Sequence, residues 1–180
     1  VGLEIPLYCY IMAVIAHLGS SAVLHLIPWQ SHRLLYMRRL DHLMIFTKIA
    51  ATYYAVIVTV MPDINSIVIY ILIFGTLLGI AIRMFFTDIH VALISLPYVL
   101  IGWAFLLDTD IFLLLLERIP VGTFVGLSGG ICYTVGAMIY AMKYPNPWPK
   151  YLGFHEVFHI FTTMGTILFT LSIFQFAVPF

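Results

Sequence analysis

Charged residues are scarce in this chain. Only 9% of its 180 residues are Asp, Glu, Lys or Arg, whereas 63% are hydrophobic, and the mean hydropathy is +1.08. A soluble domain carries about 25% charged residues and roughly 45–50% apolar residues. The scarcity of charge therefore excludes a soluble globular domain and predicts an integral membrane protein.

An excess of positive charge is also lacking, because eight basic residues balance eight acidic ones. Binding to nucleic acid depends on a basic surface that neutralises phosphates. We therefore expect no nucleic acid among the main partners of this protein.

Cysteine is nearly absent, and the start of the chain lacks a signal peptide. The two cysteines, Cys9 and Cys132, each lie inside an apolar run, whereas a secreted disulfide scaffold would need more of them in loops. We expect both to be reduced packing residues. The opening Val1-Gly2-Leu3-Glu4 has no basic segment before a short apolar stretch, so no signal peptide is visible, and the start is consistent with a trimmed chain.

Long apolar runs are what the sequence has in abundance. A membrane-spanning helix needs about 20 predominantly apolar residues, and these runs are apolar on all sides, unlike barrel strands, which alternate. The sequence predicts an all-α integral membrane protein in which residues 1–180 form a single transmembrane helical bundle domain. The six expected spans are Ile5–Ile27, Asp41–Met61, Ser66–Phe86, His90–Leu107, Val121–Met142 and Phe154–Ala177. The apolar stretch in Asp110–Arg118 is too short to span, and we expect it to lie at the membrane interface.

Basic residues near the loops predict the orientation of the spans, because positively charged loops stay in the cytoplasm. The connections after the first, third and fifth spans face one side of the membrane and carry six basic residues. The connections on the opposite side carry a single basic residue, Arg118. We therefore expect these three connections to be cytoplasmic. The basic residues on their side are Arg33, Arg38, Arg39, Arg83, Lys143 and Lys150. Six spans would place both chain ends outside, so we expect one further helix to precede Val1.

Ionisable side chains inside the predicted spans are few, and an ionisable group in lipid is a functional candidate by default. Ser21 and His25 lie four residues apart near the cytoplasmic end of the first span, and His155 and His159 lie four apart at the same end of the last. Asp41 opens the second span from that side as well. Topology therefore predicts that the three histidines and Asp41 meet at one membrane depth.

Three imidazoles with an open fourth position are the ligand set of a catalytic zinc site, so zinc is the expected cofactor. Asp41 beside it has the chemistry of a general base, although Asp41 is also a suitable N-cap for the second span. Lys48 lies two turns deeper on the Asp41 face. It either pairs with an acid on the further helix expected before Val1 or extends its ammonium group to the cytoplasmic surface.

Small residues form two helix faces suited to close packing. Gly122, Gly126 and Gly130 are spaced four apart in the fifth span, and Gly75 and Gly79 have the same spacing in the third. We expect packing within the chain rather than dimerisation at these faces.

Five segments, in order along the chain, resemble the hemolysin III family, the bacterial branch of the progestin and adipoQ receptor superfamily. The motifs S-x-x-x-H, L-D-H and H-x-x-x-H are each weak evidence for the family, but together and in this order they are specific for it. The matching segments are SSAVLHL at Ser20–Leu26, RRLDHLMIFTKIAATYY at Arg38–Tyr54, YVLIGW at Tyr98–Trp103, GGICYTVGAMIY at Gly129–Tyr140 and FHEVFHIFTTMG at Phe154–Gly165.

The resemblance implies a seven-helix bundle with a cytoplasmic amino terminus and a zinc ion near the cytoplasmic side. The family's three histidine ligands match His25, His155 and His159, and its serine and aspartate near the metal match Ser21 and Asp41. Adiponectin receptors of this superfamily are similar to alkaline ceramidases, which cleave an amide-linked acyl chain. Bacterial members are named for hemolysis and are linked to membrane-lipid homeostasis.

Two features depart from the family pattern. Val1 enters directly into what resembles the second helix, so the family's first helix has no counterpart, in agreement with the orientation argument. The family often has a further histidine a few turns after the last pair, where this chain has Leu168, Phe169 and Thr170. The three proposed zinc ligands are nevertheless intact.

Four functions remain open at this point. The leading hypothesis is a zinc-dependent lipid-amide hydrolase of the plasma membrane, with catalytic Asp41 and Ser21 and with membrane lipids as partners. The non-enzymatic alternative is a membrane sensor or receptor-like regulator with structural zinc. His155-Glu156-Val157-Phe158-His159 also fits H-E-x-x-H, the motif of an intramembrane metalloprotease. A lytic role follows from the family name alone.

Overall fold

Helices make up nearly all of the chain that the structure describes. The computed structural model describes residues 4–60, 67–86 and 91–177. Within these residues it contains seven α-helices and one short 3-10 helix, η1, and no strand. The prediction of an all-α protein is confirmed. The chain divides into two compact units, Val1–Asp88 and Ile89–Phe180, referred to below as unit 1 and unit 2.

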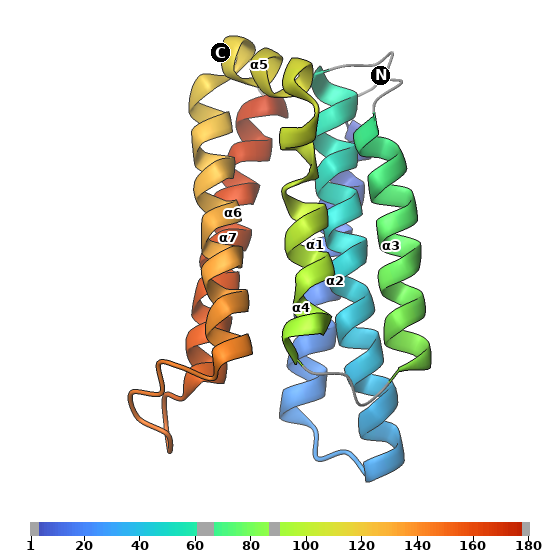
Figure 1. Cartoon of the computed structure of the whole chain (residues 1–180), viewed down its shortest axis with the longest axis vertical. Helices are drawn as coiled ribbons and strands as arrows, with labels where there is room; N and C mark the ends of the chain where they lie inside the picture. Colours follow the sequence, from blue (N-terminus) through green and yellow to red (C-terminus); the bar gives the residue numbers. More distant parts are fainter. Residues whose placement is uncertain (1–3, 61–66, 87–90, 178–180) are drawn as a thin grey trace. The chain divides into compact units, whose positions relative to one another are not determined.

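Unit 1 consists of three helices, α1 (Glu4–Leu26), α2 (Ser31–Val60) and α3 (Ile67–Phe85). α2 packs against both α1 and α3, and it runs antiparallel to each of them (Figure 1). The ring of Phe46, which is only 1% exposed, fills the place that a side chain at Gly79 would occupy. Gly79 therefore lets α3 approach α2 closely at this point, as its predicted packing role requires.

The start of α2 differs from the prediction. The helix begins at Ser31 rather than at Asp41, and the expected loop around Arg38 and Arg39 is helical. Asp41 consequently lies inside α2 and is not its N-cap. Hydropathy reveals where a helix enters lipid, whereas the helix itself continues into water because Arg, Leu and Met are good helix formers.

Unit 2 contains α4 (Val91–Gly102), η1 (Ala104–Leu107), α5 (Thr109–Arg118), α6 (Pro120–Met142) and α7 (Phe154–Ala177). α6 and α7 form a long antiparallel pair, and α4 packs on α6 (Figure 1).

The fourth predicted span, His90–Leu107, is interrupted in the structure. Its α-helical part has 12 residues with Pro97 inside, and it ends before η1. His90 lies outside the described residues. The carboxylate of Asp108 then accepts a hydrogen bond from the backbone N–H of Ile111 at 3.2 Å and caps α5. α5 has ten residues, so it is too short to span a membrane, as predicted for this stretch.

Glycines allow α6 and α7 to pack closely. A Cβ atom at Gly129 would lie 2.9 Å from the ring of Phe169 and 3.2 Å from the backbone oxygen of Gly165 on α7. Gly122 and Gly126 also face α7. The expectation of packing within the chain is confirmed for α6, but Gly130 contacts the ring of Trp103 instead. The helical angle explains this difference, because Gly129 lies nearer the centre of the Gly122–Gly126 face.

Hydrogen bonds between side chains and helices add to this packing. The hydroxyl of Ser172 donates to the carbonyl of Gly122 at 2.7 Å, and the hydroxyls of Tyr133 and Thr166 are 2.6 Å apart. The indole N–H of Trp103 donates to Thr134 at 2.9 Å. These polar side chains therefore find partners inside unit 2 and need none from lipid.

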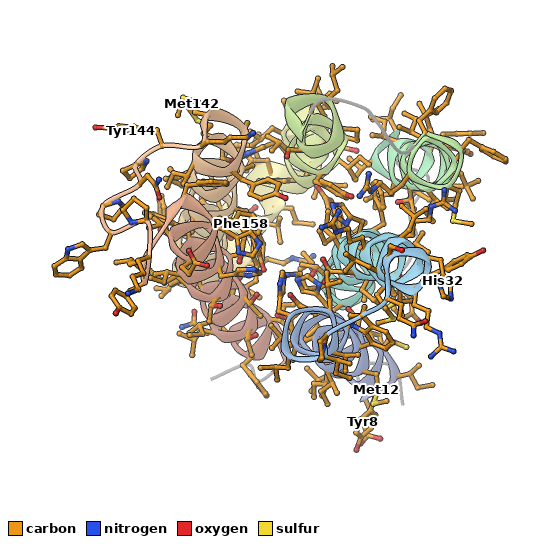
Figure 2. All side chains as sticks on the ribbon, turned by 90° about the horizontal axis from the view of Figure 1, so that it is seen from below. Tyr8, Met12, His32, Met142, Tyr144 and Phe158 are labelled. Atoms are coloured by element: carbon orange, nitrogen blue, oxygen red, sulfur yellow. The ribbon has the colours of Figure 1, made fainter. Side chains whose placement is uncertain are left out.

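Large apolar side chains cover the outside of each unit. Tyr8 and Met12 of α1 point away from unit 1, and Met142 at the end of α6 points away from unit 2 (Figure 2). All three are more than half exposed. Such a surface suits contact with lipid and would be unfavourable in water. Both cysteines are free, as expected.

Four helices within the described residues are long and apolar enough to cross a membrane. They are Glu4–Leu26, Ile67–Phe85, Pro120–Met142 and Phe154–Gln175. The number of six spans is not confirmed, since the second and fourth predicted spans are not among these four.

We predict that Gly129→Ala lowers the stability of the protein by about 1–3 kcal/mol, because the added methyl group overpacks the contact between α6 and α7. Thermal unfolding of the purified protein in detergent measures the effect. Gly19→Ala is the matched control, since nothing lies within 4 Å of a Cβ atom at Gly19. The control should be neutral or stabilising by up to about 1 kcal/mol through helix propensity. Equal unfolding temperatures for the two variants would contradict the packing argument.

Candidate functional site

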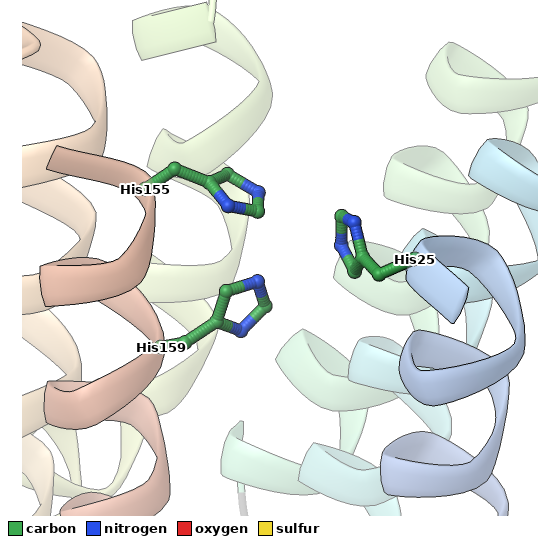
Figure 3. Close-up of side chains that lie close together, drawn as sticks. All are labelled: His25, His155 and His159. Atoms are coloured by element: carbon green, nitrogen blue, oxygen red, sulfur yellow. The ribbon is translucent and has the colours of Figure 1, made fainter. Parts of the chain in front are cut away.

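His155 and His159 form a histidine pair in the first turns of α7. Their ring centroids are 4.5 Å apart, with an angle of 79° between the ring planes. A ring nitrogen of one lies within 4.8 Å of a ring nitrogen of the other. Both rings leave the same side of α7 (Figure 3), and both side chains are partly buried. Two imidazoles one turn apart can bind a single metal ion of the kind that prefers nitrogen ligands, such as zinc.

The start of α7 is held by two capping hydrogen bonds, which position the histidine pair. The backbone N–H of Gly153 donates to the Glu156 carboxylate at 2.8 Å. The backbone N–H of Phe154 donates to the side-chain oxygen of Asn146 at 3.2 Å. Both bonds satisfy N–H groups that have no acceptor within the helix.

Aromatic rings from α6 and α7 surround one side of the histidine pair. The ring of Tyr140 lies 4.9 Å from that of Phe158 and 5.9 Å from that of His155. Phe158 is also 5.1 Å from His159. This packing restricts the orientation of both imidazoles, as a preorganised metal site requires.

Glu156 is the glutamate of the H-E-x-x-H pattern. Its side chain is 52% exposed, and one of its oxygens caps α7. Its other oxygen is 3.7 Å from Nδ1 of His155, which is longer than an ordinary hydrogen bond. This placement gives Glu156 a role at the helix start and disfavours the metalloprotease hypothesis, in which it would be the base.

Ser21, His25 and Asp41 come together within unit 1. Ser21 and His25 lie in the last two turns of α1, and Asp41 lies on α2, which packs against α1. The Ser21 hydroxyl donates a hydrogen bond to the Asp41 carboxylate, and His25 is close enough to interact with that carboxylate electrostatically. The Asp41 side chain is 14% exposed.

Lys48 is buried beside the same carboxylate. Its exposed fraction is 5%, and it interacts electrostatically with Asp41 two turns away on the same helix. The burial does not fit a side chain that extends to the membrane surface. It fits a lysine that interacts with an acid, and Asp41 is such an acid within the described residues. Pairing with an acid on a helix before Val1 stays a prediction. The spacing of seven residues, two helical turns, is the signal in the sequence that places Lys48 on the Asp41 face of α2.

The predicted site residues thus form two groups, one in each unit. His155 and His159 belong to unit 2, whereas Ser21, His25 and Asp41 belong to unit 1. That the two groups share one metal ion stays a prediction.

Comparison with known proteins gives the family of the chain. No solved structure matches it. The family described as haemolysin-III related matches residues 3–170, which is nearly the whole length. This match agrees with the order of the motifs from Ser20 to Gly165 and with the several apolar helices. The chain is therefore a multi-pass membrane protein that belongs to the haemolysin-III related family.

Proposed function

We propose that this protein is a zinc-dependent hydrolase of membrane-lipid amides that acts in membrane-lipid homeostasis. His25, His155 and His159 would hold the zinc. The observation that carries the proposal is a carboxylate buried beside a histidine. Asp41 accepts a hydrogen bond from Ser21 and lies near His25, while its Oδ1 atom is buried and accepts no hydrogen bond within the described residues.

The ends of two helices support a common metal site. His25 is one residue before the end of α1, and His155 is one residue after the start of α7. In the orientation predicted from the basic residues, both of these helix ends face the cytoplasmic side of the plasma membrane. The three imidazoles would then lie at similar depth.

Zinc held by His25, His155 and His159 would supply a Lewis acid that activates water and polarises a carbonyl oxygen. In the proposed reaction, water adds to the amide carbonyl carbon of a ceramide-like lipid and the C–N bond breaks. Asp41 takes the proton from the attacking water and passes it to the departing amine. Ser21 orients the Asp41 carboxylate through its hydrogen bond. The products are a fatty acid and an amine.

A second function is a membrane sensor or receptor-like regulator in which zinc only ties helices together. The observation that favours it is Lys48. A buried lysine that interacts electrostatically with Asp41 gives the carboxylate a structural partner within unit 1. The hydrolase and the sensor differ in what they require of Asp41, so a substitution there separates them.

The purified protein should contain one zinc ion per chain. His155→Ala and His159→Ala should each lower the zinc content sharply, because a site with two remaining imidazoles binds the metal weakly. Elemental analysis after gel filtration measures the ratio. His32→Ala, on the first turn of α2, is the control and should keep full occupancy. Unchanged zinc in both α7 variants would contradict the metal site.

Asp41→Asn should retain zinc but lose about 10²- to 10⁴-fold in the rate of amide hydrolysis, because Asn cannot accept the proton. The measurement is release of fatty acid from ceramide-like amides by protein in lipid, at matched zinc occupancy. Asp110→Asn in α5 is the control and should be as active as the wild type. Equal rates for Asp41→Asn and wild type, or no turnover by wild type on a panel of lipid amides, would favour the sensor.

The proposed orientation predicts which side of the membrane each connection faces. In a background with Cys9→Ser and Cys132→Ala, single cysteines at Gln30 and Lys150 should react from the cytoplasmic side. A cysteine at Arg118 should react from the opposite side. Labelling of intact cells with an impermeant maleimide, before and after permeabilisation, checks this. Labelling of Gln30 or Lys150 from outside would overturn the orientation.

A further inference from the structure

Two arginines of unit 1 have a side-chain nitrogen that is buried without a hydrogen bond. The Nε atoms of Arg39 on α2 and Arg83 on α3 make no hydrogen bond within the described residues. A buried donor on a charged group is costly when no acceptor is present, and guanidinium groups remain charged in proteins. Each of these two side chains therefore has a donor that a further acceptor could satisfy.

The packing of α2 against α3 turns both arginines toward the interface between these helices. Gly79 contacts Phe46, and the helices run antiparallel (Figure 1). Arg83 follows Gly79 by one turn, and His42 precedes Phe46 by one turn, so both face the interface between these helices. Arg39 lies three residues before His42 and on the same face. His42 interacts electrostatically with Arg83, in agreement with this register.

The imidazole of His42 is fixed near Arg83. Its Nδ1–H donates to the backbone carbonyl of Arg38 at 2.6 Å, and its side chain is 17% exposed. The ring is therefore anchored to its own helix.

Acidic residues do not balance this positive charge within the described part of unit 1. Its described acids are Glu4 and Asp41. Glu4 is in the first turn of α1. Asp41 accepts a hydrogen bond from Ser21 and interacts electrostatically with His25, Lys48 and Arg83, and its Oδ2 atom is 4.0 Å from Nδ1 of His42, so this one carboxylate is shared among several basic groups. Arg39 and Asp41 are two residues apart, which places them on opposite sides of α2.

The position of the cluster in the membrane indicates the kind of anion. Arg83 is two residues before the end of α3, one of the helices that can cross a membrane, so it lies at the level of lipid headgroups. Apolar side chains flank it on the outside, with Phe85 80% and Leu40 39% exposed. This place therefore suits an amphipathic ligand, whose anionic group would contact the guanidinium groups and whose apolar part would contact the apolar side chains.

We propose that Arg39, His42 and Arg83 form a binding site for the phosphate group of an anionic phospholipid. Guanidinium groups match phosphate oxygens through paired, charge-assisted hydrogen bonds, and basic pockets between transmembrane helices are suited to lipid headgroups. The acyl chains lie along Phe85 and Leu40. The site uses none of the three proposed zinc ligands, and it stands whether or not the protein is a hydrolase.

Binding of phosphatidylglycerol to the purified protein in detergent tests the site. Arg39→Gln and Arg83→Gln should each weaken binding at least tenfold, as counted from lipid adducts in native mass spectrometry. Arg33→Gln is the matched control, because Arg33 is an exposed arginine on the same helix. Unchanged affinity in both variants, or an equal loss in the control, would overturn the site.

Two competitors identify the source of the phosphate. Phosphatidylcholine, whose headgroup carries a compensating positive charge, should displace phosphatidylglycerol poorly, and inorganic phosphate should not displace it at equal concentration. Displacement by inorganic phosphate would overturn a lipid as the ligand.

Photocrosslinking of the wild-type protein tests the same site without a substitution. A phosphatidylglycerol with a photoactivatable group near its glycerol should label peptides that contain Leu40 or Phe85. This experiment decides the question if the arginine variants fail to fold. Labelling confined to other helices would overturn the proposal.

Discussion

The absence of water inside a bilayer is the constraint on which the rest of this structure depends. Every polar group inside the apolar helices must find its partner within the protein, because lipid offers none. Asp41 illustrates this, since Ser21 donates to it and Lys48 is buried near it. Ser172 is an example of an uncharged polar side chain, and its hydroxyl donates to the carbonyl of Gly122 on the neighbouring helix. Polar side chains therefore mark the inner faces of the helices, and the candidate sites lie on those faces.

Hydropathy predicted helices well where an apolar run and a helix end at the same residues. α7 begins and ends where the last span was expected, at Phe154 and Ala177. The prediction failed for α2, because Ser31–Leu40 is polar enough for water and still helical. It also failed for the fourth span, in which the chain leaves the α-helix after Gly102 although the run stays apolar to Leu107. Hydropathy measures the preference of a segment for lipid. It does not change where an α-helix gives way to a 3-10 helix within an apolar run, so it cannot predict that change.

For the candidate site, the sequence could predict which residues share a face of one helix, because this follows from helical spacing. Spacing of four residues identified the histidine pair, and spacing of seven placed Lys48 on the same helix face as Asp41 without identifying its partner. Glu156 has the position of a protease base in the motif, yet its carboxylate caps α7, a role that depends on how the chain turns before Phe154. Arg83 contributed only to orientation in the sequence, because its proximity to His42 depends on the register of α3 against α2.

α2 connects the two candidate sites because it presents a different set of residues to each neighbour. Asp41 and Lys48 lie on one side of the helix, where Ser21 of α1 meets the carboxylate. Arg39 and His42 lie on the other side, toward α3. A helix is rigid along its axis, so a ligand that draws α2 and α3 together at the arginines would also hold the backbone from which the Asp41 carboxylate extends. The proposed lipid would thus stabilise the position of the proposed base, whose Oδ2 atom lies 4.0 Å from Nδ1 of His42 at the edge of the proposed lipid site.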